Sequence, residues 1–121
     1  MSFSYLVNNE SSSYTLIQLS GSLMERYEAK DLLDEIDECI AEGSSSLVIN
    51  LEELSYMSSS GLSVLLSLLT KCRKNDGDLV LLHLNPKLKQ LLVITRLDQI
   101  IPIAESLEQA LATLNSQKQN P

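Results

Sequence analysis

The 121-residue chain has no tryptophan, one histidine and only 4% aromatic residues. Hydrophobic residues of all kinds make up 44%, which suffices for one core in a single domain of this length. That core must be built mainly from leucine, isoleucine and valine. The one histidine, His83, lies inside the apolar run LVLLHL, where we expect it to be packed and not catalytic.

Basic residues are also scarce, with 9 lysines and arginines against 16 aspartates and glutamates. The formal net charge of −7 argues against binding to nucleic acid or to an anionic membrane surface through charge. A basic or neutral protein remains compatible with this charge.

Long apolar runs are absent, and none approaches the ~18–20 residues that span a bilayer, so we expect no membrane insertion. The opening residues, MSFSYLVNNE, lack the basic and apolar regions of a secretory signal. The two cysteines, Cys39 and Cys72, stand alone in helical patterns, which disfavours a disulfide framework or a metal site. These features predict a cytoplasmic protein with buried thiols.

Short apolar runs alternate with helical patterns along the chain. Runs bounded by turn residues predict strands, and apolar residues at three- and four-residue spacing predict helices. Strands are expected at 3–8, 14–20, 47–51, 79–84 and 100–103, and helices at about 25–41, 60–74, 86–94 and 106–114. The order β-β-α-β-α-β-α-β-α predicts an α/β fold, with a mixed sheet that has parallel core strands and about four helices. We expect a single domain over residues 1–115 and a polar tail over 116–121.

Turn and capping residues support these boundaries. The polar stretch 8–13 predicts a hairpin turn, and Gly21 is expected to end the second strand. Asn85 and Pro86 match a helix N-cap followed by proline at the first helical position. Pro102 cannot donate to a strand ladder, so the last strand is expected at an edge of the sheet.

Acidic residues gather in two places. On the first predicted helix we interpret them as a mainly solvated face, with recruitment of a basic partner as the functional alternative; they are Asp31, Asp34, Glu35, Asp37 and Glu38. Glu52 and Glu53 adjoin each other but lack the further ligands that a metal site needs.

The stretch LEELSYMSSSGLSVLLSLL places its most polar tetrapeptide between two apolar segments. We call Ser58, Ser59, Ser60 and Gly61 the serine corner, because they lie where a predicted strand gives way to a helix. Such corners often carry function in α/β proteins. The first helical turn offers backbone N–H groups and the positive end of the helix dipole, which favour a phosphate. Gly61, without a side chain, lets another surface come close.

Four chemical roles can be compared for the serine corner. A hydrolase nucleophile is disfavoured, because the single histidine lies in a strand pattern and the G-x-S-x-G elbow is absent. A nucleotide-binding loop is disfavoured, because the corner has one glycine and no lysine follows before Lys71. Two roles stay open: the serines only cap the helix, or one of them accepts a phosphoryl group and so switches a protein interface.

Several segments form a longer pattern with the corner. Ser59-Ser60-Gly61-Leu62 follows a strand and opens a helix, and Asn85-Pro86, Thr95-Arg96-Leu97 and Ala110-Leu111 come later. Over about residues 4–115 this pattern resembles the STAS-domain anti-sigma factor antagonists of bacteria. Their motif usually reads (F/M)-D-S-S-G-L, followed by an N-P segment and a final A-L helix.

The resemblance implies a regulatory binding protein and not an enzyme, with no catalytic residue, cofactor or metal. In this family the unphosphorylated domain binds an anti-sigma factor, typically a serine kinase, and thereby frees a sigma factor. The kinase phosphorylates the first serine of S-S-G, which by position is Ser59, and a metal-dependent PP2C-type phosphatase reverses the step. The partner-binding surface is expected to comprise Ser22, Met24, Ser58, Ser60, Gly61, Ser63 and Ser67.

Two positions depart from the family pattern, because Ser58 and Met24 stand where the family usually has aspartate. An exposed Met24 would offer an adaptable apolar contact in place of a charge. Two alternative roles follow from the resemblance. One is a STAS scaffold subunit of a signalling or lipid-transport complex, which needs no phosphorylation. The other is a small-ligand-binding STAS module, which would need a deep pocket under the serine corner. A weak homodimer also stays open.

Overall fold

The computed structural model describes residues 3–8 and 13–118, with side chains up to residue 115. Within these residues five strands form one sheet in the order β1-β2-β3-β4-β5: β1 is Ser4–Asn8, β2 is Thr15–Leu23, β3 is Leu47–Met57, β4 is Leu79–Leu82 and β5 is Ile103–Ala104. The helices are α1 (Lys30–Ala41), α2 (Ser59–Lys74), α3 (Pro86–Ile94) and α4 (Leu107–Lys118), with short 3-10 turns η1 (Arg26–Ala29) and η2 (Leu97–Gln99). The predicted order of strands and helices is confirmed.

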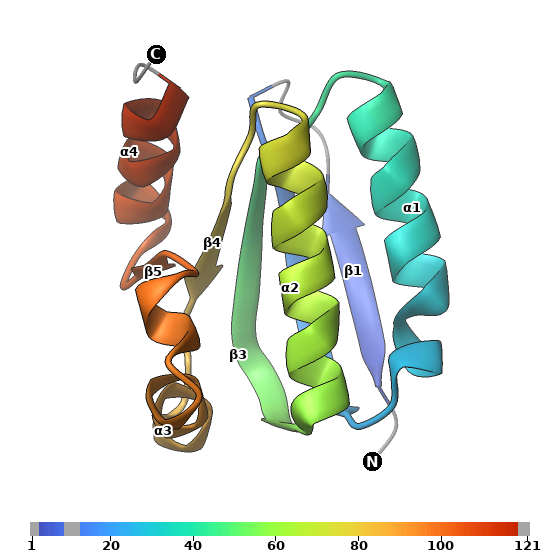
Figure 1. Ribbon diagram of the computed structural model, residues 1–121, viewed down its shortest axis with the longest axis vertical. Coiled ribbons are helices and arrows are strands. Elements are labelled where there is room, and N and C mark those ends of the chain that lie inside the picture. The colour runs from blue at the N-terminus through green and yellow to red at the C-terminus, as the bar shows by residue number, and fades with distance from the viewer. Residues whose placement is uncertain (1–2, 9–12, 119–121) are drawn as a thin grey trace.

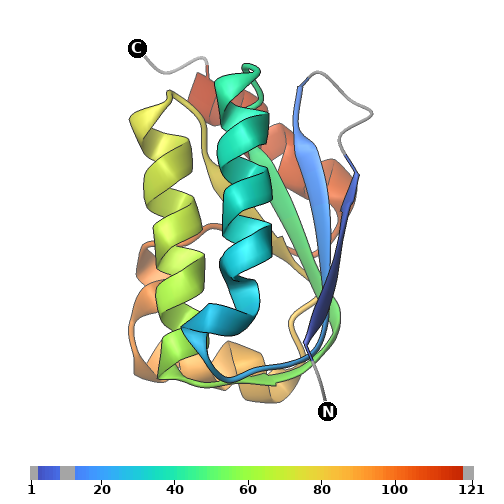
Figure 2. The same cartoon turned by 90° about the vertical axis from the view of Figure 1, so that its right-hand side faces the viewer.

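Helices cover both faces of the sheet. Figure 1 shows α1 and α2 side by side in front of it, and Figure 2 shows these two helices as a separate layer. The main core, between this layer and the sheet, is aliphatic as expected and includes Ile17, Ile49 and Leu65. A smaller core on the opposite face packs Val48 and Val80 against the apolar side of α4. The central strand β3 is therefore buried on both faces.

The direction of the strands determines which segments meet at each end of the sheet. β1 pairs with β2 antiparallel, and all the other neighbours pair parallel. The strands β2, β3, β4 and β5 consequently all run in the same direction, toward the lower end of the molecule in Figure 1. The beginning of α2, the turn η1 and the helix α3 gather at this end.

The two central strands are longer than predicted. Gly21 does not end β2, which runs on to Leu23, and β3 runs past Leu51 to Met57. The extra pairing contains two register shifts, one between Gln18 and Ser20 and one between Gly21 and Ser22. At each shift β3 advances by one residue more than β2. The buried residues of β3 then lie three apart and not two. Gly21, at a φ of +85°, lies beside the second shift and does not end the strand.

Other boundaries also need correction. The first predicted helix begins as the 3-10 turn η1, and the strand expected over 100–103 is only Ile103–Ala104, although it does lie at the sheet edge. The last helix continues to Lys118, past its expected end at about residue 114. Residues 119–121 of the expected tail and 9–12 of the expected hairpin turn lie outside the described residues.

His83 was expected to be packed within a strand, and this prediction is wrong. β4 ends at Leu82, and His83 follows it with a φ of +56° and an exposed side chain. The side chain of Ile94 is 68% exposed at the end of α3. Asn85 and Pro86 do form the predicted cap and first turn of α3.

The helices of the described chain are short or carry many polar residues. Accordingly, none of those in residues 3–8 and 13–118 is both long and apolar enough to cross a membrane. Cys39 and Cys72 are both buried, as predicted.

Candidate functional site

The serine corner lies at the carboxyl end of β3, where α2 begins (Figure 1). The end of β2 runs beside it. Leu23 pairs with Met57, and the backbone N–H of Ser58 donates to the carbonyl oxygen of Leu23 at 3.0 Å. Beyond Leu23 the chain enters η1, which contacts α2. The corner is thus built from two segments that are far apart in the sequence.

Ser58 is the N-cap of α2. Its backbone is extended, with a ψ of −178°, and its hydroxyl oxygen accepts from the N–H groups of Ser60 at 3.1 Å and Gly61 at 3.3 Å. The same hydroxyl donates to the carbonyl oxygen of Met24 at 2.5 Å. Serine here fills the capping role that aspartate also performs well. It adds a bond that an ionised carboxylate cannot donate.

Ser59 has different surroundings from those of its neighbour. Its side chain is exposed, whereas Ser58 and Ser60 are partly buried. The Ser59 hydroxyl has no hydrogen-bond partner in the part of the chain that the structure describes. The Ser58 hydroxyl already makes three hydrogen bonds, and a reaction there would remove the helix cap. The Ser59 hydroxyl can react without this loss.

Gly61 has a different role from the one expected. It is buried, and a Cβ atom at this position would lie 2.7 Å from the carbonyl oxygen of Leu23 and 2.8 Å from the Cβ of Met57. The surface that comes close to Gly61 is therefore the protein's own β2–β3 end. This corrects the expectation that Gly61 offers room to a partner.

Ser63 and Ser67 lie on the outer face of α2 and share one cation. Arg26, in η1, donates from Nη1 to the Ser63 hydroxyl at 3.1 Å and from Nη2 to the Ser67 hydroxyl at 2.9 Å. Arg26, Ser63 and Ser67 line a shallow groove together with Leu66, Thr70 and Lys71. The sequence analysis missed Arg26, because only the path of η1 across α2 brings it to these serines.

Exposed apolar side chains flank the corner. Met24 is 43% exposed, as expected, and two tyrosines that were not predicted, Tyr27 and Tyr56, are 76% and 45% exposed. Ser22, partly buried in β2, pairs in register with Tyr56. Large apolar side chains grouped on a surface are typical of protein contact sites. We call Met24, Tyr27 and Tyr56 the apolar rim of the corner.

The acidic face of α1 is mostly solvated, as expected, but part of it is paired. Asp34 accepts from Lys30 at 3.0 Å, and Asp37 accepts from Lys71 of α2 at 2.6 Å. Glu35 is partly buried and accepts from the hydroxyl of Tyr5 at 3.4 Å, and burial together with this carboxylate raises the pKa of Tyr5. Pairing of this kind reduces the charge that the face presents to a partner.

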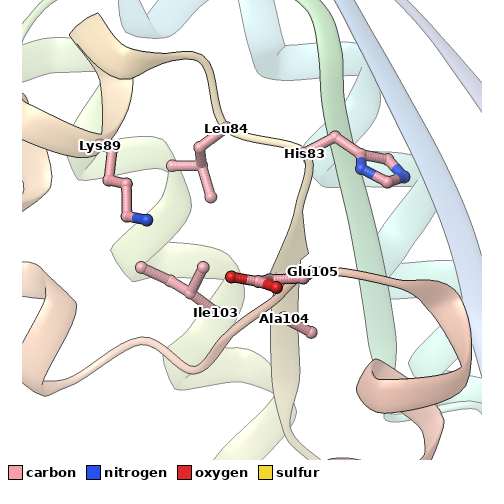
Figure 3. Close-up of a pocket in the computed structure, with 6 residues that line it drawn as sticks. All are labelled: His83, Leu84, Lys89, Ile103, Ala104 and Glu105. Atoms are coloured by element: carbon pink, nitrogen blue, oxygen red, sulfur yellow. The ribbon is translucent and has the colours of Figure 1, made fainter.

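A second hollow lies at the ends of β4 and β5, and Figure 3 shows its lining. Lys89, Leu84, Ile103 and the carboxylate of Glu105 surround it, while the imidazole of His83 points away from them. No residue of the serine corner lines this hollow. It therefore does not meet the condition set above for a small-ligand module, a deep pocket under the corner.

Metal coordination needs grouped ligands. Across the described residues, no three histidine, cysteine, aspartate or glutamate side chains are close enough together to hold a metal ion. Glu52 and Glu53 are exposed on β3, beyond the core part of the strand.

Comparison with known proteins gives a consistent family. The family model of the STAS domain matches residues 5–110. BtrV of Bordetella bronchiseptica, named among anti-sigma factor antagonists, is 33% identical over 88 residues, which are 73% of this chain and 76% of that protein. The anti-sigma-B factor antagonist of Staphylococcus aureus is 27% identical over 88 residues, which are 73% of this chain and 82% of that protein.

Solved structures share the fold. The anti-sigma factor antagonist SpoIIAA in its unphosphorylated form superposes with a TM-score of 0.70 at 20% identity, over 91% of this chain and 96% of that one. The phosphorylated form of the Bacillus protein SpoIIAA gives a TM-score of 0.70 at 22% identity, over 91% and 98% of the two chains. At these identities the likeness concerns the fold alone.

Proposed function

Since this chain belongs to the STAS domain family, we propose that it acts as an anti-sigma factor antagonist that is switched by phosphorylation of Ser59. The names of its relatives support the first part of this proposal. The single observation that best supports the second part is the contrast between Ser58 and Ser59. One hydroxyl is fully used as a helix cap, and the next is exposed and unpaired among the described residues.

In the proposed cycle the unphosphorylated protein binds an anti-sigma factor that is also a serine kinase. The surface used is the exposed Ser59 with the apolar rim, extended by Ser63 and Ser67 on α2. Burial of methionine and tyrosine side chains would supply affinity, and the small serine side chains permit close approach. The bound anti-sigma factor then no longer holds its sigma factor. Kinase and antagonist would meet in the cytoplasm.

Phosphorylation reverses the binding. The Ser59 hydroxyl oxygen attacks the γ-phosphorus of ATP bound to the kinase, its proton passes to a base of the kinase, and ADP leaves. The product carries about −1.5 to −2 additional charges in the middle of the docking surface. A phosphate there must lose its hydration when the partner docks, so binding weakens. A PP2C-type phosphatase would restore the hydroxyl by hydrolysis.

A pull-down tests this function. The baits are the wild type, Ser59→Ala and Ser59→Asp, exposed to a native cell lysate with Mg-ATP, and mass spectrometry identifies the bound proteins and the phosphorylated residues. Ser60→Ala is the matched control, because it removes the neighbouring hydroxyl and leaves Ser59 intact. We expect an ATPase-type kinase on the Ser59→Ala bait, little of it on the Ser59→Asp bait, and phosphate on Ser59 of the wild type and of the Ser60→Ala control.

The opposite pattern supports a different role. If the wild type and both Ser59 variants capture the same STAS proteins or transporter subunits, and Ser59 carries no phosphate, the serines act only as a helix cap. The protein would then be a scaffold subunit and the proposed switch would be wrong.

A further inference from the structure

Arg26 is held in an unusual way for a cation of an acidic protein. The chain has a net charge of −7, and the ion pairs among the described residues use Lys30, Lys71 and Arg73 but not Arg26. Arg26 instead donates to two neutral hydroxyls, those of Ser63 and Ser67. Hydrogen bonds between a guanidinium and an anion are stronger than those to neutral acceptors. The arginine of η1 therefore lies against α2 without its preferred kind of partner.

The spacing along α2 puts Ser59 within reach of this cation. Ser59, Ser63 and Ser67 follow one another at intervals of four residues, so they lie along one face of the helix. One helical turn advances about 5.4 Å. The Ser63 hydroxyl, to which Arg26 Nη1 donates at 3.1 Å, is about one helical turn from the side chain of Ser59. A phosphate on Ser59 and a rotation of the arginine side chain can close this gap.

The backbone N–H groups of Ser60, Gly61 and Leu62, at the start of α2, are not free to donate to a phosphate on Ser59. Helix N-termini usually receive phosphate through unpaired backbone N–H groups. Here the N–H groups of Ser60 and Gly61 already donate to the Ser58 hydroxyl, and the N–H of Leu62 donates to the Ser58 carbonyl. A phosphate on Ser59 therefore finds these donors occupied, and a side-chain donor gains importance.

We propose that Arg26 is an internal ligand for the phosphate of phosphorylated Ser59: it leaves Ser67, moves toward the start of α2, and forms a charge-assisted pair with the phosphate. This inference rests on the proposed function, because it concerns the phosphorylated form. Arg26 would then act as a positioning residue for the phosphate. In the unphosphorylated form Arg26 holds η1 against α2, and in the phosphorylated form it pulls the phosphate over the docking face.

The other charged groups near the corner are carboxylates or cations that already have a partner. In the segment of η1, the carboxylate of Glu28 accepts from the backbone N–H groups of Met24 and Glu25, and the exposed carboxylate of Glu25 adds negative charge. On α2 the nearest further cation, Lys71, lies about three turns from Ser59 and pairs with Asp37 at 2.6 Å. Arg26 is accordingly the cation best placed to answer a phosphate at Ser59.

The test uses protein in which phosphoserine is installed at position 59 during translation, so no kinase is required. The second ionisation of the phosphate is followed by ³¹P NMR against pH in an otherwise wild-type background and with Arg26→Gln, Arg26→Lys or Lys71→Gln. A nearby cation lowers the phosphate pKa. We expect the pKa in Arg26→Gln to rise by about half a unit, Arg26→Lys to recover part of the difference, and Lys71→Gln to leave the pKa unchanged.

Circular dichroism of each variant checks that the fold is kept. The proposal is overturned if the wild-type and Arg26→Gln titrations coincide, or if Lys71→Gln shifts the phosphate as far as Arg26→Gln does. These outcomes are distinct from failure of the proposed function, which would appear as absence of kinase capture and of phosphate on Ser59 in the pull-down. Either result can occur without the other.

Discussion

Adjacent residues in the serine corner do different physical work. Ser58 uses its hydroxyl as acceptor for two helix amides and as donor to the Met24 carbonyl. Ser59 exposes its hydroxyl to solvent. The stability of the corner and its reactivity therefore belong to different side chains, and substitutions can separate them.

Ser58→Ala should lower the free energy of unfolding by about 1 to 2 kcal/mol, because it removes a helix cap and the bond to Met24. Ser59→Ala, at an exposed first helical position, should change it by less than about 0.5 kcal/mol. Urea unfolding followed by circular dichroism measures both. Equal losses in the two variants would contradict the division of roles between the two serines.

Gly61→Ala should also destabilise the protein, by about 1 to 3 kcal/mol. In an unobstructed helix, alanine in place of glycine stabilises by up to about 1 kcal/mol. The sign reverses here because the new Cβ would lie 2.7 Å from the Leu23 carbonyl oxygen, which cannot move without disturbing β2. Thr70→Ala is the control, because it places alanine at an exposed position of the same helix. A stabilising effect of Gly61→Ala would contradict the close contact between Gly61 and the end of β2.

At the residue scale the sequence predicted that serines lie where a strand gives way to a helix and that they can cap this helix, and Ser58 does so. Met24 was singled out by the family resemblance alone, and its part in partner binding stays a prediction. Arg26 and the two rim tyrosines could not be predicted, since their position depends on how η1 and the extended end of β3 cross α2. The inward role of Gly61 likewise depends on the distance between two segments that are remote in the sequence.

At the scale of elements, the ends of strands were the least predictable feature. Strand prediction relies on burial that alternates with period two, and the register shifts between β2 and β3 replace this with a spacing of three in residues 51–57. The exposure of His83 was missed for a related reason, because an apolar run does not tell where a strand ends. Helix starts were better predicted, since Ser58 and Asn85 cap through their own side chains.

Asn85 also joins two elements. Its Oδ1 accepts from the N–H of Leu88 at 2.8 Å, and its Nδ2 donates to the Leu54 carbonyl of β3 at 3.1 Å. Asn85→Ala should therefore cost about 1 to 2 kcal/mol and speed hydrogen exchange in the first turn of α3. Asn85→Asp keeps the cap and loses only the donor to β3. If both variants exchange like the wild type, α3 does not depend on this tie.

At the scale of the whole molecule, a two-sided aliphatic core followed from the order and apolarity of the segments. The chain alternates strands and helices, and its few aromatic residues leave leucine, isoleucine and valine to fill both faces of the sheet. Burial of the thiols in this core has a consequence for pH dependence. Desolvation raises the pKa of Cys72 from 9.0 to about 12.

Stability should consequently fall in alkaline solution. The folded state keeps the Cys72 proton, while the unfolded chain loses it above about pH 9, so the contribution is complete below pH 9 and disappears as the pH rises toward 12. At pH 10 the loss from this group is about 1.4 kcal/mol. Urea unfolding of the wild type and Cys72→Ala at pH 7 and pH 10 measures it. Identical pH dependence in the two proteins would contradict a buried, protonated thiol.

The most direct test of the central claim is the affinity of the purified kinase captured by the unphosphorylated protein. Isothermal titration calorimetry would compare the wild type with the form that carries phosphoserine at position 59. We predict that the phosphate weakens binding by about 100-fold or more, because a charged phosphate must lose its hydration in a buried contact. Equal affinities for the two forms would contradict a switch at Ser59.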